Sequence, residues 1–433
     1  MTTGNAKPSG ARRRRPRAEM TSRGTGMLAS GVVIAALGVG LSTPILVHIG
    51  VAMTCAVAVA WIWVLLAVDS FLRTFPLARR QVSPHPLTAG RSGTVTVTIE
   101  AARSRARHRL RRSLAEHLDI REQASAELTG GMGTKATVRR EPGRLELSYA
   151  VHPVRRGRWP LGPSLVHSSD PFGMFLANTP VGEPQLVPVW PAVVDLSATA
   201  GALMGHADRI VLGARTPSPD DASLRDYREG DDLRRVHWAS SARRGTMLVR
   251  SDERAGRRPA SVILDPPRDP KALEWGISAA ASIALSVLDS GHPVRMVGAG
   301  LDPAAIRHLG DRGSAAARVD LLNQTIDLRA PVSRGAATDA LVRAASLTAE
   351  DATQGEVTVA VVDPLEKEAL DALSPLGDTG RAWALVRSDE YLEEEARATV
   401  RALRRSGWRA TTVTAADDLE ALWTRMLTAG DIS

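Results

Sequence analysis

The sequence has a single cysteine, Cys55, and aromatic residues make up only 4% of its 433 positions. One cysteine excludes an intramolecular disulfide and a cysteine-based zinc site. The usual enzyme motifs are also missing. No Gly-x-Gly-x-x-Gly follows an expected strand, and neither a Walker-type Gly-x-x-x-x-Gly-Lys nor a Gly-x-Ser-x-Gly elbow occurs. We therefore expect a protein that is not an enzyme.

Lysine is scarce, so arginine carries most of the net charge of +8. Residues 1–26 form a basic tail of net charge +6, and residues 27–80 add +2, so the chain from Gln81 onward is neutral. A neutral body with a basic tail argues against a nucleic-acid partner, because a groove binder needs positive charge on its folded surface. One arginine run remains between Arg103 and Arg112, and such a run is typical of a solvated face.

A long apolar segment follows the basic tail. Residues 24–68 contain no Asp, Glu, Lys or Arg. As one helix these residues would measure about 68 Å, roughly twice the ~30 Å hydrocarbon core of a membrane. We therefore predict two transmembrane helices within 27–72, at 27–46 and 50–71. Ser42, Thr43 and Pro44 offer a break between them, and His48 and Gly50 extend it.

The charges that flank the apolar segment predict its orientation. Arginines lie on both sides, so both termini and the soluble region are expected on the cytoplasmic side of the inner membrane. A cleaved signal peptide is one alternative, but the apolar run exceeds the 7–15 residues of a signal-peptide core. A buried hairpin in a soluble protein is the other alternative, and the length without charge argues against it.

The region 81–191 is predicted to be a β-rich domain. Alternation of apolar and polar residues at 94–99 and 144–151 indicates strands of a small antiparallel sandwich or barrel. Two segments rich in Pro and Gly, 153–163 and 170–175, indicate sharp turns. Trp159, Phe172 and Phe175 are expected to pack beneath these turns.

Charged residues are densest in the segment 215–254. Asp231 or Asp232 can cap a short helix there, which would bury Leu233, Val236 and Trp238. Two interpretations stay open for the remaining charges. They form an ion-pair network that fastens two domains, or they form a site for an anionic group or a partner's acidic side chain. The residues of the second interpretation are Arg234, Arg243 and His237.

This segment resembles the signature of the bacterial domain of unknown function 58 family, Tyr-x-x-Gly-Asp-x-x-Arg-x-His/Asp-Trp-x-x-Ser-Ala-Arg. The matching residues are Tyr227, Gly230, Asp231, Arg234, His237, Trp238, Ser241, Ala242 and Arg243. The resemblance implies an N-terminal pair of membrane helices and a C-terminal region similar to von Willebrand factor A domains. It also implies partnership with an AAA+ ATPase of the MoxR type and with other membrane proteins. We therefore expect a membrane-anchored adaptor.

The region 258–433 alternates apolar strands with amphipathic helices, which predicts a Rossmann-like α/β domain with a parallel sheet. Asp265 and Asp363 directly follow apolar runs, and ligands collect at the carboxyl ends of such strands. Together with Asp269 they would offer oxygen ligands to Mg²⁺. A domains use Asp-x-Ser-x-Ser at this position, but this chain reads Asp-Pro-Pro-Arg-Asp from Asp265 to Asp269, without either serine.

Two functional alternatives to the adaptor remain. A Mg²⁺-dependent binding domain of the A type would use the three aspartates. If no metal binds, Asp265 instead caps the following turn. The second alternative is a hydrolase with its chemistry around His237 and Asp231, although no spaced set of nucleophile, base and acid supports it.

Overall fold

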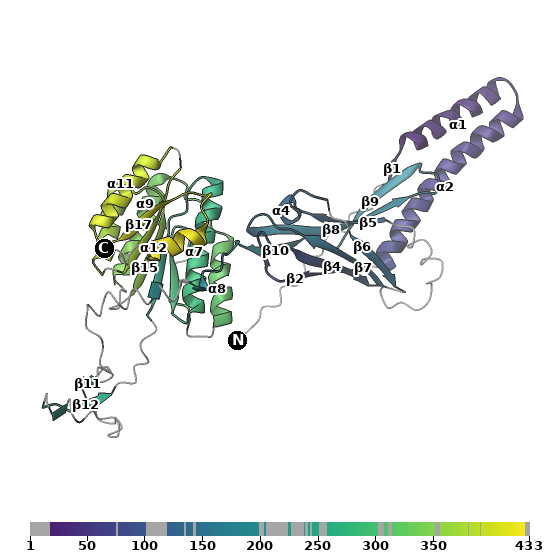
Figure 1. The fold of residues 1–433 in the computed structure, drawn as a ribbon. Coiled ribbons are helices and arrows are strands. Elements are labelled where there is room, and N and C mark those ends of the chain that lie inside the picture. Colours follow the sequence, from purple (N-terminus) through teal and green to yellow (C-terminus); the bar gives the residue numbers. More distant parts are fainter. Residues whose placement is uncertain are drawn as a thin grey trace. The chain divides into compact units, whose positions relative to one another are not determined.

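The computed structural model describes residues 18–74, 77–100, 119–133, 136–141, 144–198, 203–204, 224–226, 238, 241–242, 245–250, 258–301, 307–310, 314–350, 356–379, 381–389 and 391–428. The chain divides into two compact units, a first unit Met1–Val189 and a second unit Trp190–Ser433. The first contains a helical hairpin and antiparallel sheets, and the second contains a parallel sheet flanked by helices (Figure 1). The arginine run at 103–112 lies outside the described residues.

The hairpin consists of α1 (Ser22–Gly40) and α2 (Pro44–Thr74), which pack side by side (Figure 1). The predicted interruption at Ser42, Thr43 and Pro44 is confirmed, but its predicted extension to His48 and Gly50 is wrong. Ser42 adopts a positive φ of 50°, and the amide of Thr43 donates to the carbonyl of Gly38 at 2.8 Å, which ends α1 in a Schellman-type turn. Pro44 then begins α2, because a proline in the first helical turn loses no hydrogen bond. His48 and Gly50 therefore lie inside α2. The predicted span 27–46 is wrong at its end, because α1 ends at Gly40, whereas the predicted span 50–71 lies within α2.

Small residues bring the two helices into close contact. A Cβ added to Gly50 would lie 2.5 Å from the carbonyl oxygen of Gly31 and the amide nitrogen of Ala35, and one added to Gly38 would lie 2.6 Å from the amide nitrogen of Val47. The backbones approach so closely that any larger side chain would separate them. Such contacts between small residues are typical of helix pairs within membranes.

Three described helices are long and apolar enough to cross a membrane: Ser22–Gly40, Pro44–Leu72 and Pro270–Asp289. Their burial differs. In the apolar 18-residue stretch of each helix, only 17% and 28% of the first two are buried, compared with 78% of the third. The third helix contributes its apolar residues to the core of the second unit. The exposed apolar surface that a lipid bilayer would cover therefore lies on α1 and α2.

Both ends of the hairpin contact the same strand, β9 (Phe175–Val181). Strand β1 (Ala18–Met20), which precedes α1, pairs antiparallel with β9. The hydroxyl of Thr21 donates to the carbonyl of Gly173 at 2.7 Å and accepts from the amide of Gly24, so it caps α1 against the turn before β9. Farther along the chain, Val64 and Val68 of α2 pack in one cluster with Phe175. The hairpin therefore begins and ends next to the β-rich part of the first unit.

Two antiparallel sheets form the rest of the first unit. One has the order β2-β4-β7-β6, with β2 at Leu77–Ser83, β4 at Gly93–Glu100, β7 at Arg144–Val151 and β6 at Thr137–Glu141. The other has the order β1-β9-β8-β10-β3, with β8 at Gly157–Ser169, β10 at Gln185–Trp190 and β3 at Leu87–Thr88, and β5 (Asp119–Ala124) also pairs with β8. A short helix, α4 (Ala126–Thr129), follows β5.

A shared core joins the two sheets. Alternate residues of β4 and β7, such as Val97 and Leu147, pack in one cluster with Leu161, Val166 and Val187 of the facing sheet. This period of two is the pattern that predicted strands at 94–99 and 144–151, and that prediction is confirmed.

The prediction for the aromatic side chains was partly wrong. Trp159 packs against the core, and Phe175 is buried, but 67% of Phe172 is exposed. The carboxylate of Asp170 accepts from the amides of Phe172 and Phe175, which closes a tight loop with Phe172 at its tip. A side chain at the tip of such a loop points away from the sheet.

A buried ion pair also links the sheets. The Nε of Arg80 on β2 donates to Oε1 of Glu122 on β5 at 2.6 Å, and the two side chains are 3% and 0% exposed. Ser164 donates to the other oxygen of Glu122 and accepts from Arg80 at 3.1 Å. Gly162 makes room for the guanidinium, because a Cβ there would lie 2.6 Å from its central carbon. The hydroxyl of Tyr149 is buried without a hydrogen-bond partner among the described residues, and burial, with Glu122, raises its pKa against the opposing charge of Arg80.

The second unit contains five parallel strands in the order β14-β13-β15-β16-β17. Their bounds are Ala260–Leu264 for β13, Val294–Gly298 for β14, Val357–Val362 for β15, Ala382–Arg387 for β16 and Arg409–Val413 for β17. The predicted parallel α/β domain is confirmed at this level. Numbered along the chain, the order is 2-1-3-4-5, one of the two common orders of doubly wound sheets.

Helices cover both faces of this sheet. The core on one face of the sheet contains residues such as Val262 of β13. Three helices contribute to this core: α7 (Pro270–Asp289), α8 (Ser314–Ile326) and α12 (Leu419–Thr428). The core on the opposite face contains residues such as Ile263 of β13. It is shared by α9 (Arg334–Glu350), α10 (Lys367–Leu373) and α11 (Glu393–Arg405), and a 3-10 helix (Ser374–Thr379) follows α10. Neighbouring residues of one strand enter opposite cores, which is why these strands are apolar throughout.

Candidate functional site

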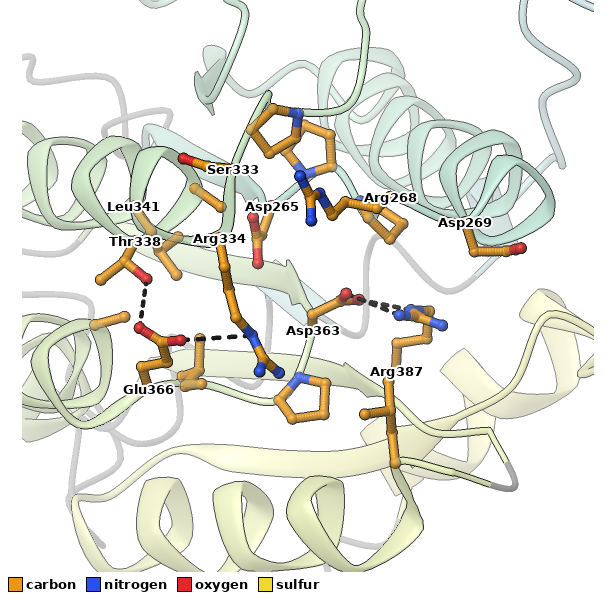
Figure 2. A pocket seen from close by; sticks show the side chains of 18 residues that line it. Asp265, Arg268, Asp269, Ser333, Arg334, Thr338, Leu341, Asp363, Glu366 and Arg387 are labelled. Atoms are coloured by element: carbon orange, nitrogen blue, oxygen red, sulfur yellow. Dashed lines mark hydrogen bonds and ion pairs between the residues drawn. The ribbon is translucent and has the colours of Figure 1, made fainter.

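A cavity of the second unit lies outside the carboxyl ends of β13 and β15. In the order 2-1-3-4-5 this is the point where the chain turns from one side of the sheet to the other, and ligands of open α/β sheets bind in the crevice formed there. The cavity has a volume of about 300 Å³. The loops after β13, β15 and β16 and the first turns of α9 line it (Figure 2). We refer to it as the switch-point cavity.

Asp265 follows β13 directly, and its amide donates to the carbonyl of Val361 at 2.9 Å. Its side chain lines the switch-point cavity (Figure 2). The oxygen Oδ1 is buried and has no hydrogen-bond partner among the described residues. Burial, reinforced by the charge of Asp363, raises the pKa of Asp265 to about 6, although the Asp363 backbone and Arg387 act in the opposite direction.

Asp363 follows β15 and is held by Arg387 at the end of β16 (Figure 2). The Nε and Nη2 atoms of Arg387 donate to the two oxygens of Asp363 at 2.5 and 2.8 Å, and Nη1 donates to Asp389 at 2.6 Å. All three nitrogens of the guanidinium are therefore engaged. Hydrogen bonds from Arg387 to Asp363, together with both carboxylate charges, raise the pKa of Arg387 despite its burial.

Asp269, the third aspartate of the predicted metal set, also lines the switch-point cavity, but its carboxylate has a different hydrogen-bond partner. Its Oδ2 accepts from the amide of Ala272 at 2.8 Å, which makes Asp269 the N-cap of α7. All three aspartates therefore line one cavity, and the capping role that was considered for Asp265 belongs to Asp269. Among the described residues, no three His, Cys, Asp or Glu side chains are grouped so that they could hold a metal ion.

Two residues of α9, which the sequence pattern did not single out, complete the cavity. The Nε of Arg334 lies 3.4 Å from Oε1 of Glu366, and the hydroxyl of Thr338 donates to Oε2 of Glu366 at 3.1 Å (Figure 2). The Nη2 of Arg334 also lies 3.7 Å from Oε2 of Glu395. Helix α9 is rich in alanine and polar residues, so it has little periodic apolar signal. On the opposite wall, Arg268 donates to the carbonyl of Val332 at 2.6 Å.

Most of the charged signature segment lies outside the described residues. This holds for Tyr227, Gly230, Asp231, Arg234, His237 and Arg243. In the described part, β11 (Leu224–Asp226) pairs antiparallel with β12 (Leu248–Arg250). Ser241 is buried, but Trp238 is 64% exposed, so the predicted burial of Trp238 under a short helix is wrong.

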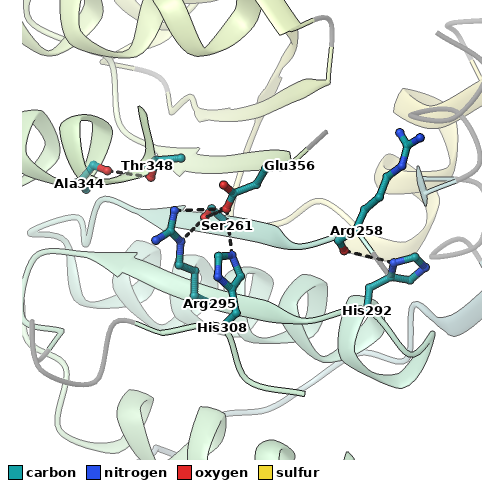
Figure 3. A network of polar contacts seen from close by, with 8 residues as sticks. All are labelled: Arg258, Ser261, His292, Arg295, His308, Ala344, Thr348 and Glu356. Atoms are coloured by element: carbon teal, nitrogen blue, oxygen red, sulfur yellow. Dashed lines mark hydrogen bonds and ion pairs between the residues drawn. The ribbon is translucent and has the colours of Figure 1, made fainter. Parts of the chain in front are cut away.

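A second polar cluster lies at the amino ends of β13, β14 and β15 (Figure 3). Arg295 donates to Ser261 at 2.6 Å and to Glu356 at 3.3 Å, and His308 contacts the same carboxylate at 3.1 Å. Burial works against the charge of Glu356, but hydrogen bonds from His308 and Ser261, with the charge of Arg295, hold its pKa below the ordinary value. The cluster thus pairs buried charges between neighbouring strands, although Oε2 of Glu356 has no hydrogen-bond partner among the described residues.

A scan against models of protein families found no match to this sequence, and a search of curated proteins found none either.

Proposed function

We propose that this protein is a membrane-anchored adaptor whose cytoplasmic region binds a partner protein. The observation that carries the proposal is the hairpin of α1 and α2, whose apolar surface is exposed and whose two ends both return to β9. A hairpin that leaves and re-enters one folded unit keeps the rest of the chain on one side of a bilayer. The basic residues next to both ends favour the cytoplasmic side.

A binding role for the second unit is supported by the switch-point cavity. Its charged groups hold one another in ion pairs, and Oδ1 of Asp265 has no donor among the described residues. Such a site can recognise a partner without carrying out chemistry. The resemblance of residues 227–243 to the domain of unknown function 58 signature supports an AAA+ ATPase of the MoxR type as that partner.

Co-purification tests the proposal. The full chain would be solubilised from membranes in a non-ionic detergent, purified by an affinity tag and analysed by mass spectrometry. We expect an AAA+ ATPase to co-purify with the wild type and to be lost with Arg234→Ala or Asp265→Asn. The surface variant Arg318→Ala, whose ion pair with Asp289 is exposed, serves as the matched control. If no ATPase co-purifies with the wild type, the adaptor proposal is wrong.

The unpartnered oxygen of Asp265 next to Asp363 favours one second candidate, a Mg²⁺-dependent binding domain. Mg²⁺ would have to compete with Arg387 for Asp363. This candidate predicts that millimolar Mg²⁺ raises the unfolding temperature of the wild type but not that of Asp265→Asn. Equal unfolding temperatures with Mg²⁺ and with EDTA would rule it out.

A further inference from the structure

The three arginines that line the switch-point cavity already have acceptors. Arg387 is shared between Asp363 and Asp389, Arg334 contacts two glutamates, and Arg268 donates to a backbone carbonyl. The buried Oδ1 of Asp265 has no donor among the described residues. A buried carboxylate oxygen is costly to leave unsatisfied, so a cationic donor that reaches the carboxylate of Asp265 would stabilise it.

The loop after β13 is unsuited to an anion. Phosphate sites at this position use free backbone amides at a helix N-terminus. Here Pro266, Pro267 and Pro270 have no amide hydrogen, and the side chain of Asp269 already accepts from the first turn of α7. Few donors therefore remain to hold a negative ligand in this loop.

The charges around the cavity favour a cation. Its lining contains four carboxylates and three guanidinium groups, and the lining arginines contact two further carboxylates, Asp389 and Glu395. Carboxylates thus outnumber guanidinium groups two to one in this set. The volume of about 300 Å³ is at the small end of ligand pockets, which suits a single side chain better than a large cofactor.

Two large apolar side chains stand next to the cavity. Val332 is 89% exposed and Tyr391 is 92% exposed, and each directly adjoins a residue that lines the cavity, Ser333 or Leu392. Exposed tyrosines are frequent anchors of protein interfaces, because the ring offers a large apolar area and the hydroxyl can hydrogen-bond. Two exposed apolar side chains beside a polar pocket offer a surface that a peptide segment with mixed side chains would match.

We propose that the switch-point cavity receives an arginine or lysine side chain of a partner protein, which donates to the carboxylate of Asp265 while neighbouring apolar residues of the same segment pack on Val332 and Tyr391. This inference rests on the proposed adaptor function and specifies the chemistry of the partner. It differs from the Mg²⁺ candidate, because a basic side chain needs neither Asp363 nor Asp269 to be free.

Short peptides test the proposal. The probes are fluorescently labelled acetyl-Gly-Leu-X-Leu-Gly-amides, where X is arginine, lysine or neutral citrulline, which has nearly the shape of arginine. Binding to the full-length protein in a non-ionic detergent with EDTA would be followed by fluorescence anisotropy. We expect the arginine or lysine peptide to bind at least about tenfold more tightly than the citrulline peptide, a difference of ~1.4 kcal/mol.

Three variants locate the contact. Asp265→Asn should abolish the preference for a basic residue and bind the citrulline peptide as before. Asp269→Asn is the matched control: it removes another cavity carboxylate but keeps a good helix cap, so the preference should persist. Tyr391→Ser should weaken all peptides by a similar factor, because it removes apolar contact rather than charge. Thermal unfolding of each variant would first establish that it is folded.

Equal binding of the basic and citrulline peptides up to millimolar concentration would overturn the proposal. So would a preference that Asp269→Asn reduces as much as Asp265→Asn, or one that exists only when Mg²⁺ replaces EDTA. Because the titration contains no ATPase, it can fail while the co-purification succeeds, and the reverse outcome is equally distinguishable.

Discussion

Replacing Glu122 with leucine would leave the guanidinium of Arg80 inside the first unit without its carboxylate. The pair is almost fully buried, so water cannot solvate the remaining charge. Removing one partner of a buried ion pair costs about 3–5 kcal/mol. In a unit of this size each kcal/mol corresponds to roughly 2–4 °C, so we expect the unfolding temperature of the first unit to fall by about 6–20 °C.

The double variant Arg80→Met with Glu122→Leu tests the cause. It removes both charges and fills the space with apolar side chains, a change that is often neutral or stabilising. We expect its unfolding temperature to recover to within about 5 °C of the wild type. Tyr149→Phe is a matched control, because it removes a buried hydroxyl that bonds to none of the described residues and should leave the unfolding temperature unchanged or slightly raised.

Differential scanning calorimetry of the full-length protein in detergent would measure these effects. Two units should give separate or broadened transitions, so each transition is fitted individually. The transition of the second unit serves as an internal control, since neither Arg80 nor Glu122 belongs to it. If Glu122→Leu lowers the first transition by less than about 2 °C, or if the double variant loses as much as the two single variants combined, our account of the ion pair is wrong.

Three further predictions concern other sites. The pKa of Asp265 is raised from 3.8 to about 6, so the protonated carboxyl group favours the folded state. This contribution to the free energy of unfolding is complete below pH ~4 and is lost as the pH rises through about 6. Asp265→Asn should therefore stabilise the second unit at pH 7.5 by on the order of 3 kcal/mol, and by much less at pH 4; an equal difference at both pH values would contradict this. Asp269→Ala should cost about 1 kcal/mol through loss of the α7 cap, whereas Asp269→Asn should cost almost nothing in calorimetry. Gly50→Val should separate α1 from α2 and lower the temperature at which the detergent-solubilised protein aggregates, whereas Gly40→Val, with open space around its Cβ, should behave like the wild type.

Local pattern was enough to predict several elements. The absence of charge between Arg23 and Asp69 predicted two helices, and the period of two predicted β4 and β7. The position of the helix turn was predicted less well. Gly50 was expected to interrupt a helix, but it lies in α2 because its missing side chain lets the backbone of α1 approach. This property depends on a neighbouring helix, so propensity alone does not reveal it.

The candidate site could be predicted only in part. Asp265 and Asp363 were found because each ends an apolar strand, and parallel strands end at the same edge of the sheet. Arg334 and Thr338 were missed, because α9 has no strong apolar stripe and their relevance comes from its position over the strand ends. Most residues of the signature segment lie outside the described structure, so their predicted roles stay predictions.

The sequence by itself determined which segments are apolar enough to form the hairpin and the parallel strands, because these properties are local and repeat with the period of a helix or a strand. Only the tertiary structure decided what each aspartate does. Asp269 caps a helix, Asp363 is held by Arg387, 24 residues farther along the chain, and Asp265 keeps a buried oxygen that has no donor in the described part of the chain. The three carboxylates are alike in sequence, and they differ because folding surrounds them with different neighbours.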